Sequence, residues 1–305
     1  MNKIIKNKIE QLHRLYRELS LENENVLYEI AMAELPEMVY NSNAIENSTL
    51  TLEDTEQILT QGIVPKKADM REVYEAKNLA KITEYLLNNP KKTLSIRLIL
   101  DLHKMLLSDI EDDIAGRFRR GREWVRVGNH LGANPMFVRS LMEELVENYN
   151  AGKQSHFLDS IAHFHAEFET IHPFCDGNGR IGRVIINQQL MKLGYPPIIV
   201  QNKSKIKDYY ALFTAYQRNM KFDGFSSLFA ALLLESLHKR LSYLTARRII
   251  PLALWAKQNA VKGNVAANKA KRQTIPAFRL REKWVISENY RENMDIFEFF
   301  HGKIN

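Results

Sequence analysis

The sequence predicts a mainly α-helical protein, on two observations. Glycine and proline, which interrupt helices, are sparse at 13 and 9 of 305 residues. Several stretches also place apolar side chains three and four positions apart, the spacing that gathers them on one helix face. These stripes run over residues 12–19, 96–106, 137–149 and 161–171. Each indicates a helix that packs one face into a core, and the chain is long enough for one sizeable core and a small second domain.

The helical pattern stops near residue 245, which divides the chain. A long apolar helix ends there, and a basic stretch with two glycine- or proline-containing turn signals follows it. We therefore expect three parts. They are an N-terminal helical region over residues 1–90, a helical core over 91–245 and a small domain over 246–305.

One stretch within the core has β rather than helical character. Residues 116–128 place Phe118, Trp124 and Val125 among arginines, with a glycine at each end. Aromatic and β-branched residues between glycines are typical of short strands joined by a turn. We expect a β-hairpin here.

The net charge of +7 is concentrated in one segment. Residues 247–284 contain ten basic residues and one acidic residue, whereas residues 1–246 are balanced. Such a segment is either a surface for nucleic acid or an acidic partner, or a solvated basic face. The single cysteine, Cys175, cannot form an internal disulfide, and neither a secretory signal nor a membrane-spanning run is apparent. We therefore expect a cytoplasmic protein without a membrane partner.

Residues 172–183 carry the most informative pattern in the chain. The run reads His-Pro-Phe-Cys-Asp-Gly-Asn-Gly-Arg-Ile-Gly-Arg and separates two apolar-striped helices. Its glycines let backbone N–H groups turn toward one point, and the start of the second helix adds partial positive charge. Arg180 and Arg183 lie three apart and would add paired hydrogen bonds to phosphate oxygens. The pattern predicts a phosphate-binding loop, although each residue alone is compatible with a plain helix-to-helix turn.

Two residues of this loop suit chemistry as well as binding. Asp176 is an anion beside an anion site, an arrangement that Mg²⁺ bridging the carboxylate to a phosphate would explain. His172 can accept a proton near neutral pH, as a general base must. The loop therefore indicates a reaction at a phosphate group.

The same run resembles the signature of the Fic family, His-x-Phe-x-(Asp/Glu)-Gly-Asn-Gly-Arg-x-x-Arg, and matches it at every fixed position. The wider resemblance spans residues 34–244. It implies a Fic-type helical core with a β-hairpin flap over the active site, for which residues 116–128 are the candidate. It also implies that AMP is transferred from ATP to a Ser, Thr or Tyr hydroxyl of a target protein, or onto the enzyme itself.

The resemblance implies a role for each matched residue. His172 would be the base, Asp176 would hold Mg²⁺ on the α- and β-phosphates, and Phe174 would anchor the loop. Phosphate binding would involve Gly177, Asn178, Gly179, Arg180 and Arg183. On the adenine side, Tyr210 would stack on the base and Gln217 would bond its edge. The alternative for this last pair is a core tyrosine and a surface glutamine.

An upstream segment resembles the inhibitory motif of the same family, Ser/Thr-x-x-x-Glu-Gly/Asn. Ser42 and Glu46 lie four apart, hence on one helix face, and Asn47 is suited to end that helix. The resemblance implies that Glu46 pairs with Arg183 in place of the γ-phosphate, while Ser42 supports the helix. The resting enzyme would then be weakly active. Without the loop downstream, the same residues would indicate an ordinary polar helix face.

The C-terminal segment resembles the winged helix-turn-helix modules of excisionase- and MerR-like proteins. We expect, in order, helices and strands over residues 252–258, 265–272, 274–279 and 283–286. The second helix would enter the major groove of duplex DNA, bound through residues 247–286. The candidate phosphate contacts are Lys269, Lys271, Arg272, Arg279 and Arg281. A module that binds protein instead is the alternative.

Other functions are compatible with the same residues. Glu46 could orient a water molecule for removal of AMP from a modified protein. The core could sense nucleotide on behalf of a DNA-binding regulator, although the intact His172 favours catalysis. A loop that recognises phosphates also accepts transfer of UMP or phosphocholine, and a homo-oligomer is compatible with the sequence.

Overall fold

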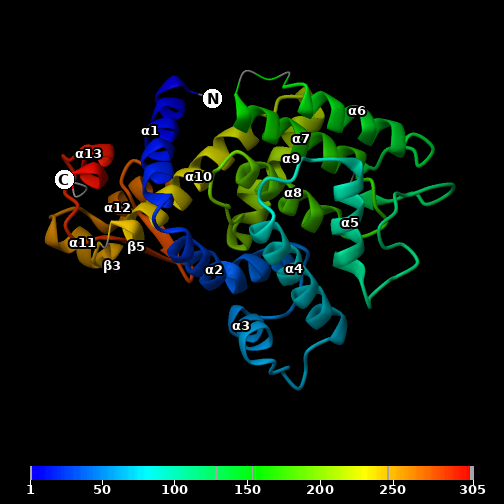
Figure 1. Cartoon of the computed structure of the whole chain (residues 1–305), viewed down its shortest axis with the longest axis horizontal. Coiled ribbons are helices and arrows are strands. Elements are labelled where there is room, and N and C mark those ends of the chain that lie inside the picture. The colour runs from blue at the N-terminus through cyan, green and yellow to red at the C-terminus, as the bar shows by residue number, and fades with distance from the viewer. Residues whose placement is uncertain (1, 128–129, 153, 155, 246, 303–305) are drawn as a thin grey trace. The chain divides into compact units, whose positions relative to one another are not determined.

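The computed structural model describes residues 2–127, 130–152, 154, 156–245 and 247–302. Its elements are mainly helical, as the sequence predicts, and they fall into two compact units (Figure 1). The loop unit comprises Ala33–Tyr195 and Ile199–Ser226, and the terminal unit comprises Met1–Met32, Pro196–Ile198 and Ser227–Asn305. Helices α2 (Glu24–Ile45) and α10 (Asp223–Leu244) each begin in one unit and end in the other.

The loop unit is built around helix α8. Apart from its parts of α2 and α10, the elements of this unit are α3 (Leu52–Gln61), α4 (Met70–Asn88), α5 (Ile96–Leu107), β1 (Arg126–Val127), β2 (His130–Leu131), α6 (Val138–Asn150), α7 (Phe157–Ile171), α8 (Asn178–Lys192), η1 (Asn202–Ser204), η2 (Lys205–Tyr210) and α9 (Ala211–Asn219). Helix α8 packs against α4, α5 and α7. It is buried on every side, which explains why its sequence lacks a one-sided apolar stripe.

Local sequence signals set the start of α5 and the end of α2 in the loop unit. The Ser95 hydroxyl accepts the backbone N–H of Leu98 at 3.1 Å and begins α5. Asn47 lies just past the end of α2 with a φ of 71°, a conformation that asparagine tolerates better than most residues. Its N–H donates to the carbonyl of Ala44 at 3.2 Å, so the chain turns sharply there.

The β-hairpin is present but lies farther along the chain than expected. Strand β1 pairs antiparallel with β2, with Arg126 opposite Leu131, whereas residues 117–124 form turns and irregular structure. Arg117 accounts for the shift. The Arg117 guanidinium makes two 2.8 Å hydrogen bonds to the Glu123 carboxylate, which folds this stretch back on itself. Gly128, the expected end of the hairpin, lies outside the described residues.

The terminal unit holds a small sheet with helices beside it. Its elements are α1 (Lys3–Ser20), β3 (Ile249–Pro251), α11 (Leu252–Gln258), α12 (Gly263–Lys271), β4 (Phe278–Leu280), β5 (Lys283–Ser287) and α13 (Ile296–His301), together with the unit's parts of α2 and α10. The antiparallel sheet has the order β3-β5-β4. Two helices followed by a hairpin are present as expected, and β3 adds a third strand.

The first hairpin strand starts later than the sequence indicates. We expected it over residues 274–279, but β4 begins at Phe278. Pro276 has no N–H to donate to a ladder, and the Ala277 N–H turns back to the Ile275 carbonyl at 2.8 Å. Within the same unit, Lys8 of α1 donates to the carbonyl of Gln273 at 2.6 Å.

Across the described residues, no helix has the length and apolar character needed to cross a membrane.

Candidate active site

The loop between α7 and α8 is fixed by its own side chains. His172 ends α7 with a φ of 53°, and Gly177 begins α8 with a φ of 80°, where a Cβ would lie 2.8 Å from the Leu106 side chain. The Asn178 amide closes the loop, since it accepts from the N–H of Phe174 and donates to its carbonyl, each at 2.8 Å. Hydrogen bonds within the loop therefore stabilise its shape.

Phe174 anchors this loop in the core. Its side chain is fully buried and stacks on the His103 ring with centroids 3.7 Å apart. His103 also bridges two segments: its Nε2 bonds the Asp176 carbonyl at 3.0 Å, and its Nδ1 accepts the Gly116 N–H at 3.0 Å. Burial lowers the pKa of His103 to about 4, so the ring is neutral. Sequence analysis missed His103, because only the fold brings it to the loop.

Arg119 is a second support that the sequence analysis missed. Its buried guanidinium donates to four backbone carbonyls, those of Glu123, Ala133, Ile171 and His172, at 2.7 to 3.1 Å. These carbonyls come from the segment before the hairpin, the segment after it and the end of α7. Arg119 thus joins the hairpin region to the loop that carries His172.

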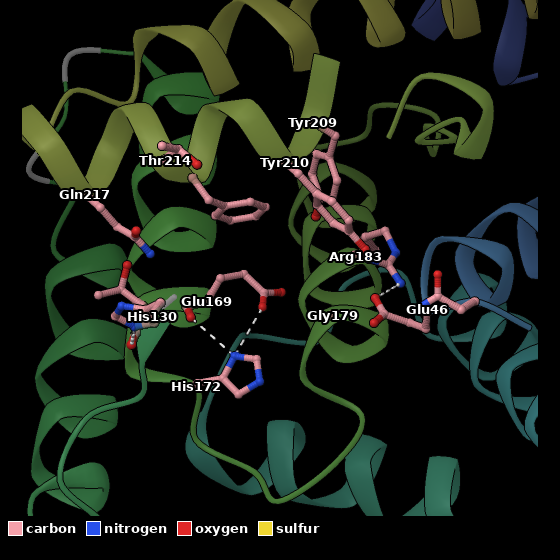
Figure 2. A pocket seen from close by; sticks show the side chains of 13 residues that line it. Glu46, His130, Glu169, His172, Gly179, Arg183, Tyr209, Tyr210, Thr214 and Gln217 are labelled. Atoms are coloured by element: carbon pink, nitrogen blue, oxygen red, sulfur yellow. Dashed lines mark hydrogen bonds and ion pairs between the residues drawn. The ribbon is translucent and has the colours of Figure 1, made fainter. Parts of the chain in front are cut away.

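A cavity of about 530 Å³ opens beside the start of α8 (Figure 2). Its lining comprises Glu46, Asn47, His130, Glu169, Thr170, His172, Gly179, Arg183, Tyr209, Tyr210, Phe213, Thr214 and Gln217. The structure thus gathers residues from the turn after α2 and from β2, α7, α8, η2 and α9 around one space. The first N–H groups of α8 have no carbonyl partner within the helix, which makes its start suited to an anion.

His172 faces the cavity as a neutral imidazole. Its side chain is 14% exposed, and its Nδ1 lies 3.3 Å from the Glu169 carbonyl. Burial is the main cause that lowers the pKa of His172 to about 4. With the proton on Nδ1 and directed at that carbonyl, Nε2 carries the lone pair and is the atom able to accept a proton.

Glu169 is a site residue that no sequence pattern marked. Its Oε2 lies 3.7 Å from His172 Nδ1, and its Oε1 has no hydrogen-bond partner among the described residues. Burial, followed by the nearby Glu46 carboxylate, raises the pKa of Glu169 to about 8. A largely protonated acid therefore lies beside the imidazole at neutral pH.

Arg183 is held by the end of α2. Its Nε donates to the Ser42 hydroxyl at 3.0 Å, and one terminal nitrogen donates to the Ser42 carbonyl and the Glu46 carboxylate, each at 2.8 Å. Burial, the largest single cause, acts to lower the pKa of Arg183, but Glu46, Tyr209 and Glu169 together raise it. Ser42 thus contacts the arginine directly, whereas the sequence suggested only helix support. Gly179 lets Glu46 approach, because a Cβ there would collide with its Oε1.

Asp176 lies outside the cavity lining, between two arginines. Its Oδ2 is 2.7 Å from Arg71, and its Oδ1 is 3.1 Å from Arg180. Burial acts to raise the pKa of Asp176, but Arg180, the Gly177 N–H and Arg71 together lower it. Arg180 also pairs with Glu75 at 2.8 Å and is nearly buried. Arg180 and Arg183 therefore have different carboxylate partners: Glu75 and Asp176 for Arg180, and Glu46 for Arg183.

A magnesium ion fits this arrangement only together with a nucleotide. Asp176 offers one ionised carboxylate, 34% exposed, and Mg²⁺ commonly takes its other ligands from phosphates and water. Within the part of the chain that the structure describes, no group of three or more His, Cys, Asp or Glu side chains is arranged to hold a metal. The Arg71 contact with Oδ2 would have to open for the ion to use that oxygen.

The adenine-side candidates line the cavity opposite the loop. Tyr210 is 37% exposed and donates its hydroxyl to the Ile45 carbonyl at 2.8 Å. Gln217 lies on α9 and points into the space from the far side (Figure 2). Tyr209 beside them is buried, and its hydroxyl bonds His165 at 2.7 Å. This wall combines aromatic rings, which can stack on a flat ring, with an amide that can both donate and accept hydrogen bonds.

The basic candidates of the terminal unit differ in availability. Lys271 and Arg272 are exposed at the end of α12. Arg279, in contrast, pairs with both Glu235 oxygens and lies 4.7 Å from the centre of the Trp284 ring. Lys269 forms an ion pair with Glu292. Arg279 is thus a structural residue of the sheet rather than an available phosphate contact.

Comparison with known proteins supports the assignment of the loop unit. Residues 93–190 match the Fic/DOC family. "Protein adenylyltransferase Fic" of Drosophila melanogaster is 31% identical over 187 residues, which is 60% of this chain and 38% of the fly protein. The protein of the same name in Drosophila persimilis is also 31% identical, over 60% of this chain and 36% of that protein. The match thus spans little more than a third of these relatives.

Solved structures share the fold. A Fic domain containing signaling protein from Bacteroides thetaiotaomicron superposes with a TM-score of 0.67 and 23% identity over 78% of this chain and 97% of that chain. A Fic family protein from Desulfovibrio desulfuricans gives 0.66 and 20%, over 95% of this chain and 97% of that chain. Residues 93–190, which contain the loop that joins α7 to α8, thus match the Fic/DOC family, and the chain shares the fold of these solved Fic structures.

Proposed function

We propose that this protein transfers AMP from ATP to a hydroxyl group of a target protein. The observation that carries the proposal is the position of His172: its Nε2 is free to accept a proton in a cavity that also contains the start of α8 and Arg183. The relatives named protein adenylyltransferase support the same reaction. The target's hydroxyl oxygen would bond to the α-phosphorus, the bond from that phosphorus to pyrophosphate would break, and the hydroxyl proton would pass to Nε2.

The other residues would position the nucleotide rather than react. The first N–H groups of α8 and the Arg183 guanidinium would bind phosphate oxygens, and Tyr210 and Gln217 would face the base. Mg²⁺, held by Asp176, would neutralise charge on the phosphates. Arg180 would join them only after it exchanged its present carboxylate partners for phosphate. Positioning and charge stabilisation supply most of the catalysis in such transfers.

We further propose that the resting protein is self-inhibited. The support is that Arg183 makes three hydrogen bonds to Ser42 and Glu46 and is only 7% exposed, so its charge is already engaged. A γ-phosphate would have to displace Glu46 to reach it. An equilibrium between a closed state and an open state of the α2 end would then set the activity.

The test is incubation of the purified protein with ATP and Mg²⁺, followed by mass spectrometry of the protein and of added candidate targets. The expected product is a hydroxyl residue that carries AMP, formed by the wild type and absent with His172→Ala. A different added group, such as a phosphate alone, would refute AMP transfer. Removal of AMP is the second activity of interest, because Glu46 lines the same cavity with its side chain 37% exposed. Incubation with AMP-modified target tests it.

For the terminal unit we propose binding to duplex DNA. Two helices with a hairpin, and the exposed Lys271 and Arg272 at the end of α12, support this. Binding by the full chain that weakens steeply as salt rises is the expected result. Absence of binding at low salt would favour a protein-binding module.

A further inference from the structure

The end of α2 is tied to the wall of the cavity by Lys205, which no sequence motif marked, and by Tyr210, the candidate for stacking on the base. A helix ends with carbonyl groups that lack partners within the helix and carry partial negative charge. Lys205 lies at the start of η2, and its ammonium group donates to three oxygens there: the carbonyls of Ala44 and Ile45 and the side chain of Asn47, at 2.9 to 3.0 Å. All three of its donors are thereby used.

Two further bonds join the same pair of segments. Tyr210, at the other end of η2, donates its hydroxyl to the Ile45 carbonyl at 2.8 Å. The side-chain oxygen of Asn41 accepts the backbone N–H of Asn202 at 3.0 Å. The segment that begins at residue 202 therefore contacts α2 over more than one helical turn, and its contacts concentrate around Glu46.

The shape of this wall segment is itself unusual. Residues 205–210 form a π-helix, a rare conformation that is frequent at functional sites. It carries Lys205 at its first position and Tyr210 at its last, so one short element presents both groups to α2. Tyr210 lines the cavity as well, together with Glu46 and Arg183 (Figure 2).

We propose that Lys205 is a positioning residue for Glu46, and that Lys205 and Tyr210 together form a clamp that holds the α2 end in its inhibitory position. The inference rests on the proposed AMP transfer and its inhibition by Glu46. The Glu46 carboxylate is 37% exposed, and among the contacts the structure describes it bonds only Arg183. This ion pair therefore contributes only modestly to keeping the α2 end in place. The clamp binds the backbone carbonyls just before Glu46 and the Asn47 side chain just after it, which lowers the entropy cost of keeping the carboxylate on Arg183.

The clamp also connects two parts of the site. Tyr210 is the candidate for stacking on the base, and its hydroxyl is committed to the Ile45 carbonyl. A base that reorients Tyr210 would weaken one bond of the clamp, so nucleotide binding and release of α2 would favour each other. Lys205 would continue to hold the closed state until its three bonds also opened.

The experiment compares Lys205→Met with the wild type, with Lys207→Met as the matched control. Lys207 is an exposed lysine on the same π-helix, and no bond from it to α2 is described. Two quantities are measured: incorporation of labelled AMP, and hydrogen exchange of the backbone amides of residues 44–48. We expect Lys205→Met to raise transfer by roughly tenfold, because charge-assisted bonds to the helix end are lost, and to speed exchange of those amides. Lys207→Met should match the wild type in both.

The Glu46→Gly background separates this proposal from the proposed function. Once Glu46 is absent, the clamp has no carboxylate to hold, so Glu46→Gly with Lys205→Met should transfer no faster than Glu46→Gly alone. If Glu46→Gly binds ATP but transfers nothing, AMP transfer is wrong, while the exchange measurement still tests the clamp. If Lys205→Met leaves both exchange and transfer at the wild-type values, or lowers transfer, the clamp is wrong.

A milder variant guards against loss of folding. Tyr210→Phe removes only the hydroxyl bond to Ile45 and keeps the ring. The expected result is a smaller acceleration of exchange at residues 44–48 than in Lys205→Met. Exchange identical to that of the wild type in a folded Tyr210→Phe protein would remove Tyr210 from the clamp.

Discussion

Replacing Glu46 with glycine should activate the protein. The change removes the carboxylate that lies 2.8 Å from Arg183 and leaves the loop that carries His172 untouched. Arg183 is 7% exposed and Glu46 37%, so the pair lies between a surface ion pair, worth up to about 1 kcal/mol, and a buried one, whose loss costs about 3–5 kcal/mol. We take about 2 kcal/mol as the free energy by which this ion pair stabilises the closed state. Its loss corresponds to a roughly thirtyfold increase in the rate of AMP transfer.

The assay is incorporation of labelled AMP, onto a target or the enzyme itself, at equal protein concentration. Ser42→Ala should give a smaller gain, because Arg183 keeps its bonds to the Ser42 carbonyl and to Glu46. Arg183→Ala should lose activity even in the Glu46→Gly background, since the γ-phosphate would lack its partner. A Glu46→Gly protein that binds ATP and transfers AMP no faster than the wild type would refute self-inhibition.

Four further results are expected. His172→Ala should abolish transfer while ATP affinity, measured by calorimetry, stays near the wild-type value, because only proton acceptance is lost. Since burial lowers the pKa of His172 to about 4, kcat/KM should hold as pH falls below 6.5 and decline only on approach to pH 4; a decline centred at 6.5 would contradict the buried imidazole. Asp176→Ala should weaken Mg²⁺-dependent ATP binding sharply, and equal binding with and without Mg²⁺ in the wild type would exclude that role. Lys271→Ala with Arg272→Ala in the full chain should reduce the salt dependence of DNA binding by about two units of log–log slope, measured by fluorescence anisotropy.

The pH prediction has a counterpart in stability. The pKa of His172 is about 4 in the folded protein and near 6.5 when unfolded, so between these values the unfolded chain binds more protons. The free energy of unfolding should therefore fall as pH drops from 6.5 toward 4. Denaturation curves of the wild type and His172→Gln over this range would isolate the contribution, because glutamine does not titrate there.

Features that depend only on residues close together in the sequence could be predicted. The helical fold and the loop could be predicted, because the apolar spacing and the closely spaced residues 172–183 carry their meaning within a short window. The hairpin was located only approximately. Its position depends on the ion pair between Arg117 and Glu123 and on the hydrogen bonds from Arg119 to carbonyls up to 53 residues away. The sequence alone does not show which residue an arginine will contact.

The supporting contacts of the site could not be predicted for the same reason. Arg180 was expected beside Arg183 at the phosphates, but it pairs with Glu75, about a hundred positions upstream, and with Asp176. Lys205 finds its partners about 160 residues earlier in the chain. Glutamates and lysines are common, so no spacing rule separates these from solvated side chains. They become visible only when the fold brings distant segments together.

AMP transfer itself is tested most directly by the fate of the phosphates of ATP. Glu46→Gly protein is incubated with Mg²⁺ and with ATP labelled either on the α-phosphate or on the γ-phosphate, and label bound covalently to protein is counted after denaturation. We expect that α-label is retained, that γ-label is not, and that Glu46→Gly with His172→Ala retains neither. Retention of γ-label would show phosphate transfer instead, and α-label that persists without His172 would show that the imidazole is not the base.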